Sequence, residues 1–214
     1  MTDTLVVNVK MNNVTAKWQD KEVAVELPAN FTAEQLMTSV SEVIVDALAG
    51  QTPAAIEVVN EIDGLVVLNE ASESVTPVMF ADDNDAHFIE ALTMNGIGGQ
   101  LERKNGHALT TGTPVIQVLR LKNNMADVYA HAAMYRTVTA YLRSMLTGQN
   151  IVTVEEAKLT GLFDQEINKW DTQGLALTDL TVIQLPEIGN VVAHDLTNNV
   201  LVEKMSTLPS VKVR

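Results

Sequence analysis

The sequence contains no cysteine among its 214 residues, and only 4% of its residues are aromatic. The missing cysteine excludes thiol nucleophiles, Cys-ligated zinc, iron–sulfur clusters and disulfides. No run approaches the ~20 apolar residues that a membrane-spanning helix needs. The start also lacks the basic and apolar regions of a signal peptide. We therefore expect a cytoplasmic protein with no membrane partner, found also in the virion if it is viral.

Positive charge is missing from a long internal block. Between Glu22 and Glu102 there is no Lys or Arg, while fifteen acidic residues accumulate. The net charge of the whole chain is −13, so this block (22–102) holds the acidic excess. Nucleic-acid affinity comes largely from Lys and Arg side chains that displace counterions. The composition therefore argues against direct, sequence-specific binding to nucleic acid.

Hydrophobic residues make up 46% of the chain, and their pattern begins as strands. Apolar and polar residues alternate over 5–27, interrupted by polar turn signals, which predicts an antiparallel meander. A helix follows, because Thr32 and Gln35 match a capping box and Gly50 supplies a stop. The apolar residues between them share one helical face, which predicts a buried side.

The rest of the chain gives weaker local signals. Each of the following is an expectation from turn residues, caps or periodicity: a hairpin turning at Asp63-Gly64, a strand near 75–80, a short helix over 86–94, a hairpin turning at Asn105-Gly106, a strand over 115–121, a long helix from 123 or 124 to 148, a helix opened by Thr153 and Glu156, and strands over 182–185, 191–193 and 200–202.

Together these elements predict one α+β domain over residues 1–214. Antiparallel hairpins and a mixed sheet would pack with three to four helices. The glycines at 96–99 mark an internal boundary, if there is one. The polar hairpin over 100–111 would project as an arm, and residues 204–214 would form a C-terminal arm.

A search for chemistry finds no catalytic constellation. The glycines at 96–99 lack the spacing of a dinucleotide fingerprint, and no Walker loop is present. Asp82, Asp83, Asp85 and His87 lie within six residues, but they lack the alternation and the central glycine of a calcium loop. We interpret them as a helix cap and predict no catalytic, cofactor or metal residues.

Cationic and aromatic residues are the candidates for an interface. Tyr129, Arg136 and Arg143 recur every seven residues, so on one long helix they would share a face. Arginine is favoured at protein interfaces because its planar group pairs bidentately and stacks. The candidate set is completed by the basic residues of the two predicted arms: Arg103, Lys104, Lys204, Lys212 and Arg214.

The leading hypothesis is a non-enzymatic structural protein that assembles into a homo-oligomer. Its basic tail would dock on the acidic block of a neighbouring copy. A cysteine-free chain rich in Val, Thr and Asn resembles bacteriophage virion components in composition, so the partners would be copies of itself and other virion proteins.

Two alternatives stay open. One is an acidic inhibitor that mimics nucleic acid and occupies a DNA-binding protein. The other is a carboxylate- or metal-dependent enzyme with its site around Asp82–His87, joined by Glu90 or Asp195.

Overall fold

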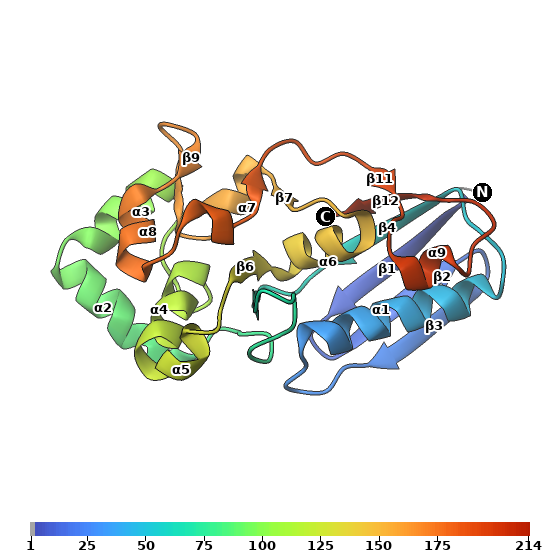
Figure 1. Cartoon of the computed structure of the whole chain (residues 1–214), viewed down its shortest axis with the longest axis horizontal. Coiled ribbons are helices and arrows are strands. Elements are labelled where there is room, and N and C mark those ends of the chain that lie inside the picture. Colours follow the sequence, from blue (N-terminus) through green and yellow to red (C-terminus); the bar gives the residue numbers. More distant parts are fainter. Residues whose placement is uncertain (1–2) are drawn as a thin grey trace. The chain divides into compact units, whose positions relative to one another are not determined.

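The computed structural model describes residues 3–214. These residues form two compact units, and each unit is assembled from separate segments of the chain. Unit 1 comprises the residues up to Ile62, Val138–Asn150 and Val191–Arg214. Unit 2 comprises Asp63–Thr137 and Ile151–Asn190. Both mix helices with strands, so the fold class is α+β, as the sequence predicts (Figure 1).

Unit 1 is built on a six-stranded mixed sheet in the order β11-β12-β4-β1-β2-β3. The β1, β4 and β12 strands run parallel to one another, and the other neighbouring pairs are antiparallel. Three helices belong to the same unit. The elements are β1 (Thr4–Lys10), β2 (Asn13–Trp18), β3 (Lys21–Glu26), α1 (Ala33–Leu48), β4 (Ala55–Asn60), α6 (Val138–Thr147), β11 (His194–Asp195), α9 (Asn199–Val202) and β12 (Ser210–Val213).

The core of unit 1 follows from the period-two alternation of its strands. Leu5, Val7 and Val9 on one face of β1 are fully buried. The α1 helix packs against β1, β2 and β3, and α6 packs against β12. Figure 1 shows both helices lying along the sheet. The meander and the α1 helix are therefore confirmed.

The start of α1 shows how local sequence fixes a boundary. The Thr32 hydroxyl accepts a hydrogen bond from the Gln35 backbone N–H, and the Gln35 side chain accepts one from the Thr32 N–H. These two bonds satisfy two donors that a helix start leaves unpaired. The helix ends at Ala49, which has a left-handed φ of 49°, one residue before the expected glycine.

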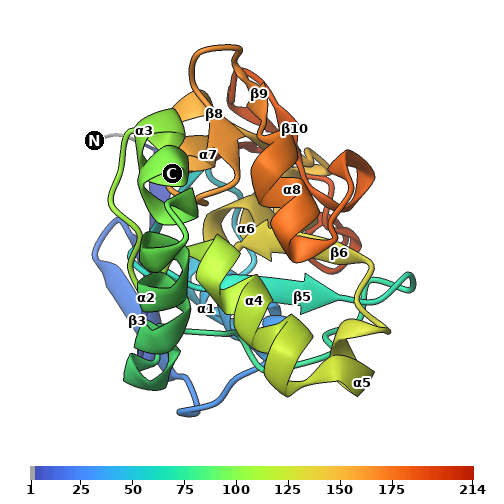
Figure 2. The same cartoon turned by 90° about the vertical axis from the view of Figure 1, so that its left-hand side faces the viewer.

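Unit 2 contains short helices and two-stranded sheets. The β5 strand pairs with β6, β7 with β10, and β8 with β9. Figure 2 shows α2 beside α3, and α4 near α8. The strands are β5 (Leu65–Leu68), β6 (Met134–Thr137), β7 (Ile151–Val152), β8 (Phe163–Asp164), β9 (Lys169–Trp170) and β10 (Glu187–Ile188). The helices are η1 (Asp83–Asp85), α2 (Ala86–Met94), α3 (Ile97–Asn105), α4 (Pro114–Asn124), α5 (Ala126–Tyr129), α7 (Val154–Lys158), α8 (Thr172–Thr178) and η2 (Val182–Gln184).

Both predicted hairpins are wrong. The strands flanking Asp63-Gly64 do not pair, because β4 joins the sheet of unit 1 while β5 pairs with β6 in unit 2. The predicted arm over 100–111 is mostly helix α3, which begins at Ile97 and ends at Gly106 in a left-handed conformation. A left-handed glycine suits a helix end as well as a hairpin turn. The Asn-Gly pair therefore did not distinguish the two.

Two predictions in the middle of the chain, one of a strand and one of a helix, also need correction. Residues 115–121, expected as a strand, lie in α4, which Pro114 opens at its first turn. The expected long helix to Gly148 is interrupted by β6, so only its last part, α6, is helical to the expected end. The expected strands at 182–185 and 200–202 are the short helices η2 and α9. The described residues hold more helices than the three or four expected.

Several local predictions hold. The α2 helix spans 86–94 as expected, and the capping box of Thr153 and Glu156 opens α7.

The glycines at 96–99, where the sequence suggested an internal boundary, lie inside unit 2, and Gly96 is the N-cap of α3. Residues 210–213 of the segment expected as a C-terminal arm form β12, between β4 and β11. Within residues 3–214, no helix combines the length and hydropathy that a bilayer crossing requires.

Candidate functional site

The polar chemistry of unit 2 gathers at two places, and the first is the acidic cluster before α2. Asp85 is 1% exposed, and its carboxylate accepts a 2.9 Å hydrogen bond from Arg120 Nη1. The same nitrogen lies 3.6 Å from Asp82 Oδ2, and Arg120 Nη2 donates to the Phe80 carbonyl. Because Arg120 comes from α4, the guanidinium ties the start of α2 to that helix.

The two carboxyl groups of this cluster respond oppositely to their surroundings. Asp82 accepts hydrogen bonds from the backbone N–H and the side chain of Asn84, and these bonds lower its pKa. Burial raises the pKa of Asp85, with the charge of Arg120 acting against that rise. Asp82 thus stays ionised more readily than Asp85.

This geometry does not support a cation site around Asp82–His87. Arg120 already places a positive charge between two of the acids. His87 turns its Nδ1 to the Asn84 carbonyl, 2.7 Å away. Among residues 3–214 there is no group of three His, Cys, Asp or Glu side chains placed to hold a metal ion.

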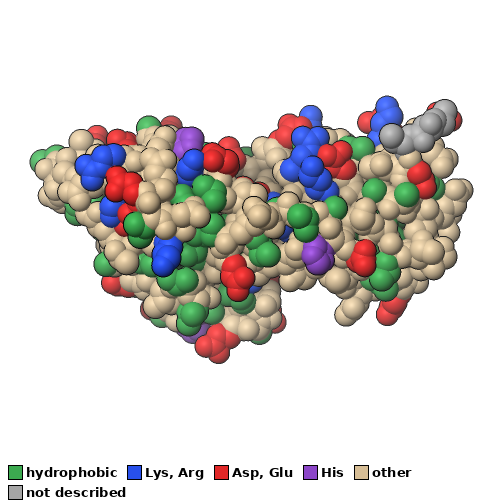
Figure 3. All heavy atoms as spheres, turned by 90° about the horizontal axis from the view of Figure 1, so that it is seen from above, with side chains coloured by type: hydrophobic (Ala, Val, Ile, Leu, Met, Phe, Trp, Pro, Cys, Tyr) green, Lys and Arg blue, Asp and Glu red, His purple; other side chains and the backbone are tan. Residues whose placement is uncertain are grey.

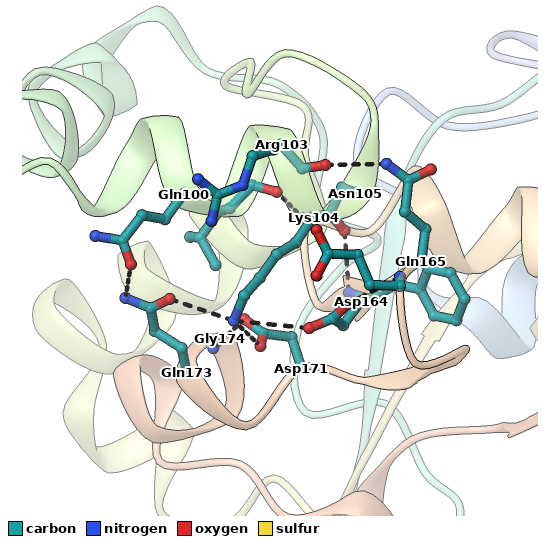
Figure 4. A network of polar contacts seen from close by, with 12 residues as sticks. Gln100, Arg103, Lys104, Asn105, Asp164, Gln165, Asp171, Gln173 and Gly174 are labelled. Atoms are coloured by element: carbon teal, nitrogen blue, oxygen red, sulfur yellow. Dashed lines mark hydrogen bonds and ion pairs between the residues drawn. The ribbon is translucent and has the colours of Figure 1, made fainter.

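The second polar cluster surrounds Lys104 at the end of α3 (Figure 4). Its Nζ lies 2.5 Å from Asp171 Oδ1 and 3.8 Å from Asp164 Oδ2. Both acids are buried, with exposed fractions of 1% and 8%. Asp171 also caps α8, because its Oδ2 accepts a hydrogen bond from the Gly174 N–H.

Amide side chains extend this cluster on both sides. Buried Asn105 donates to the Leu101 carbonyl and accepts from the Phe163 N–H. Gln165 donates to the Arg103 carbonyl, and Gln173 donates to Gln100. The contacts join α3, the β8–β9 hairpin and α8, as Figure 4 shows. We interpret the cluster as the polar centre that holds these short elements together.

The three interface candidates at seven-residue spacing do not lie on one helix. Tyr129, Arg136 and Arg143 lie in α5, β6 and α6, so the expectation of a shared helix face is wrong. The helix they would have shared breaks after Tyr129, whose hydroxyl donates to the Thr178 carbonyl. Arg143 is only 2% exposed and donates to the Val213 carbonyl inside unit 1.

The basic residues of the expected arms belong to both units. Arg103 is exposed in the last turn of α3, while neighbouring Lys104 is held by two buried acids. Lys204 and Lys212 are exposed, and Arg214 pairs with Glu57 of β4 at 2.7 Å. On the face that Figure 3 shows, basic and acidic side chains are interspersed. An interface through these residues and self-association stay predictions.

Sequence reasoning missed Arg120, Asp164 and Asp171. Arg120 lies 35 residues from Asp85, and Asp171 lies 67 residues from Lys104, so neither pair leaves a local pattern. Of these three residues, only Asp171 could have been found from the sequence, because an Asp before a short helical segment is a favoured N-cap.

The glycines at 96–99, which lack the spacing of a dinucleotide fingerprint, include one with a packing role. A Cβ at Gly98 would lie 3.2 Å from the Thr93 backbone nitrogen. Gly98 thus makes room for the close approach of α3 to α2, and no phosphate need be invoked.

Comparison with solved structures shows that proteins with this fold include carbohydrate kinases. The gluconate kinase of Lactobacillus acidophilus has a TM-score of 0.84 and 19% identity, over 97% of this chain and 47% of that one. The xylulose kinase of Rhodospirillum rubrum gives 0.83 and 13%, over 98% and 48%. The Plasmodium falciparum glycerol kinase solved with ADP gives 0.79 and 12%, over 97% and 47%. No curated protein sequence matches the chain.

The sequence itself identifies the family. Residues 3–208 match the model of the N-terminal domain of the FGGY family of carbohydrate kinases. The chain belongs to this family, and it spans about half the length of the solved kinases it resembles.

This finding overturns the functional hypothesis drawn from composition. The family consists of enzymes, so the prediction of a non-enzymatic virion or capsid component is wrong, and so is the alternative of an acidic inhibitor. The hypothesis rested on the absence of catalytic motifs, but a domain that supplies part of a larger enzyme need not carry a complete constellation.

Proposed function

We propose that this chain acts as the N-terminal domain of a carbohydrate kinase. The enzyme would transfer a phosphoryl group from a nucleoside triphosphate to a hydroxyl of a sugar, a sugar acid or a polyol. The observation that carries the proposal is the family match over residues 3–208, which includes both units. Gluconate, xylulose and glycerol are the substrates named for the similar structures, so they define the chemical class.

The proposal assigns no metal site and no catalytic base to this chain. Nucleotide phosphates bring Mg²⁺, which supplies charge neutralisation at the transferring phosphoryl group. Residues 3–214 offer no three-ligand group for such an ion, and Arg120 pairs with the most compact acidic cluster. In such an enzyme, positioning the acceptor is a large part of catalysis. We infer that this domain contributes acceptor binding.

Ligand-dependent stability tests the proposal. The purified chain is unfolded thermally with D-gluconate, D-xylulose or glycerol, and inositol serves as the polyol control. A ligand that binds only the folded state stabilises it, by about 2.7 kcal/mol at one hundred times its Kd. We expect at least one of the three compounds to raise the midpoint above the inositol value. ADP release from added ATP is measured in parallel with each compound. Equal midpoints in all four compounds, with no sugar-dependent ADP release, would contradict the proposal.

A further inference from the structure

A groove of about 590 Å³ lies within unit 1, between α1 on one side and α6 and α9 on the other. Its floor includes buried Met37 and Tyr141. The side facing α1 is uncharged and includes Met145 and the 60% exposed Val200. Methionines adapt their shape to different partners and recur at surfaces that bind helices.

The α1 side of the groove presents two parallel stripes of side chains. Residues four apart in a helix lie on the same face. Positions 34, 38, 42 and 46 thus form an outer stripe, which contains Glu34, Glu42 and Asp46. Positions 37, 41 and 45 form the inner stripe, which contains Met37 and Val45. The outer stripe is about 18 Å long at 1.5 Å per residue. The groove therefore pairs an acidic edge with an apolar floor over about three helical turns.

Two of these acids occupy positions of α1 at which a negative charge destabilises a helix. Asp46 lies in the last turn of α1, where the helix dipole favours cations, and that turn has no basic residue. Glu42 and Asp46 are four residues apart, a spacing at which like charges repel. Neither carboxylate forms an ion pair or hydrogen bond within residues 3–214. Lys21 comes close, but its Nζ donates to the Asp46 backbone carbonyl. Proteins break such local rules mainly at functional sites, which makes this acidic edge a candidate binding surface.

We propose that this groove binds a basic amphipathic helix of about three turns from a partner protein. Apolar side chains of that helix would lie on the floor and against Met145 and Val200. Its Lys or Arg residues, four positions apart, would pair with Glu42 and Asp46 along the acidic edge. This is the helix-in-groove mode of recognition, with charge complementarity setting the orientation.

The partner is not a second copy of this chain. No helix of residues 3–214 carries two basic residues four positions apart. The helices with two basic residues are α3, with Arg103 and Lys104, and α4, with Arg120 and Lys122. Lys104, Arg120 and Lys122 are already paired with acids. A different sequence must supply the basic stripe.

A pair of synthetic peptides tests the proposal. The probe is a 14-residue helix with Leu and Met on one face and three Lys residues four positions apart beside it. In the comparison peptide Gln replaces the three Lys. Fluorescence anisotropy with the full chain should show at least tenfold tighter binding of the Lys peptide at low salt. That ratio should shrink at high salt, because exposed charges are then screened.

Matched variants of the protein locate the binding. The Glu42→Gln/Asp46→Asn variant should lose at least fivefold in affinity for the Lys peptide, and Val200→Ser should weaken both peptides. The control variant Glu22→Gln/Glu26→Gln removes the same charge from exposed positions of β3 and should bind as the unchanged protein does. Equal losses in the two double variants, or equal binding of the two peptides, would overturn the proposal. So would a dimer in light scattering that the Glu42→Gln/Asp46→Asn variant abolishes, because the occupant would then be a second copy.

Discussion

The two units differ in how many polar side chains they bury. In residues 3–214, unit 1 buries three polar or charged side chains, whereas unit 2, of similar size, buries nine. The three of unit 1 are Ser39, Arg143 and Thr147. The nine of unit 2 are Thr76, Asp85, Asn105, Thr113, Gln117, Thr160, Asp164, Asp171 and Thr178. All three buried acids of this set belong to unit 2.

Element length explains this difference. The α1 helix of unit 1 has 16 residues and covers three long strands with one apolar face. The helices of unit 2 have at most 11 residues, and its strands at most four. Short elements leave more backbone ends near the interior, and those ends must find hydrogen-bond partners. Side chains such as Asn105 and Asp171 supply them. Unit 1 thus depends on apolar packing, and unit 2 depends in addition on specific polar contacts.

The largest expected effect comes from removing the cation of the Lys104 cluster in unit 2. Lys104→Met leaves the buried carboxylates of Asp171 and Asp164 without their counter-charge. Breaking a buried pair from one side costs about 4 kcal/mol. Urea unfolding at pH 7 should show a loss of that size.

A double variant shows whether the uncompensated charge is the cause. Lys104→Met/Asp171→Asn removes one carboxylate but retains an N-cap oxygen for α8, so it should recover part of the loss. If Lys104→Met is as stable as the unchanged protein, the cluster does not hold unit 2 together.

The second prediction concerns a close approach of backbone to side chains in unit 2. Gly161 has a φ of +73°, and a Cβ there would lie 2.5 Å from Val115 Cγ1 and 2.9 Å from Thr113 Cγ2. Gly161→Ala therefore combines a strained backbone with overpacking, for a loss of about 3 kcal/mol.

Gly99→Ala is the matched control. Gly99 lies in α3, and a Cβ there meets nothing within 4 Å. Alanine is the better helix former, so this variant should be unchanged or more stable by about 0.5–1 kcal/mol. If Gly161→Ala is as stable as Gly99→Ala, the packing around Gly161 is looser than the structure indicates.

The sequence predicted unit 1 far better than unit 2, and the same contrast explains why. The alternation of β1 to β3 and the apolar face of α1 are local patterns, so they can be recognised in consecutive residues. Unit 2 depends on contacts such as Arg120 with Asp85, which no local period encodes. The sequence of α4 predicted a strand because four of the five residues at 115–119 are apolar, and all five are buried in the helix that forms instead. A helix that is buried on most sides loses the period that distinguishes it from a central strand.

The candidate site was harder to predict than the fold. The acids at 82–85 were predicted to cap the helix over 86–94, but the carboxylate that caps a helix is Asp82 at η1, and Asp85 makes no side-chain cap hydrogen bond to α2. Their partner Arg120 was not predicted. Family membership came only from comparison of the whole chain, because no short motif among these residues specifies phosphoryl transfer.

The third prediction uses one motif that occurs in both units. Thr32 of α1 and Thr153 of α7 each form a complete capping box. Replacing either threonine with alanine should cost about 1 kcal/mol. If the units unfold together, Thr32→Ala and Thr153→Ala will shift one common transition equally. If they unfold separately, hydrogen exchange will show each change confined to its own unit. A shift of both units by one variant alone would contradict independent unfolding.

The smallest expected effect is a dependence on pH that belongs to unit 2. Burial raises the folded-state pKa of Asp85 above its usual 3.8. A raised carboxyl pKa contributes stability that is complete below the unfolded-state pKa and is lost as pH rises through the folded-state pKa. Asp85→Asn removes this titration but keeps an oxygen for Arg120. The free energy of unfolding of the variant, minus that of the unchanged protein, should therefore increase as pH rises from 3 to 6.

The neighbouring carboxyl supplies an internal control with the opposite sign. The pKa of Asp82 is lowered by its hydrogen bonds from Asn84, so its contribution is present above the unfolded-state pKa and is lost as pH falls through the folded-state pKa. For Asp82→Asn the same difference should decrease with rising pH, at the acid end of the range. Urea unfolding of the three proteins at half-unit pH steps measures both slopes. If the Asp85→Asn difference also decreases with rising pH, the charge of Arg120 outweighs burial at Asp85, and the ionised form of Asp85 stabilises unit 2 at neutral pH.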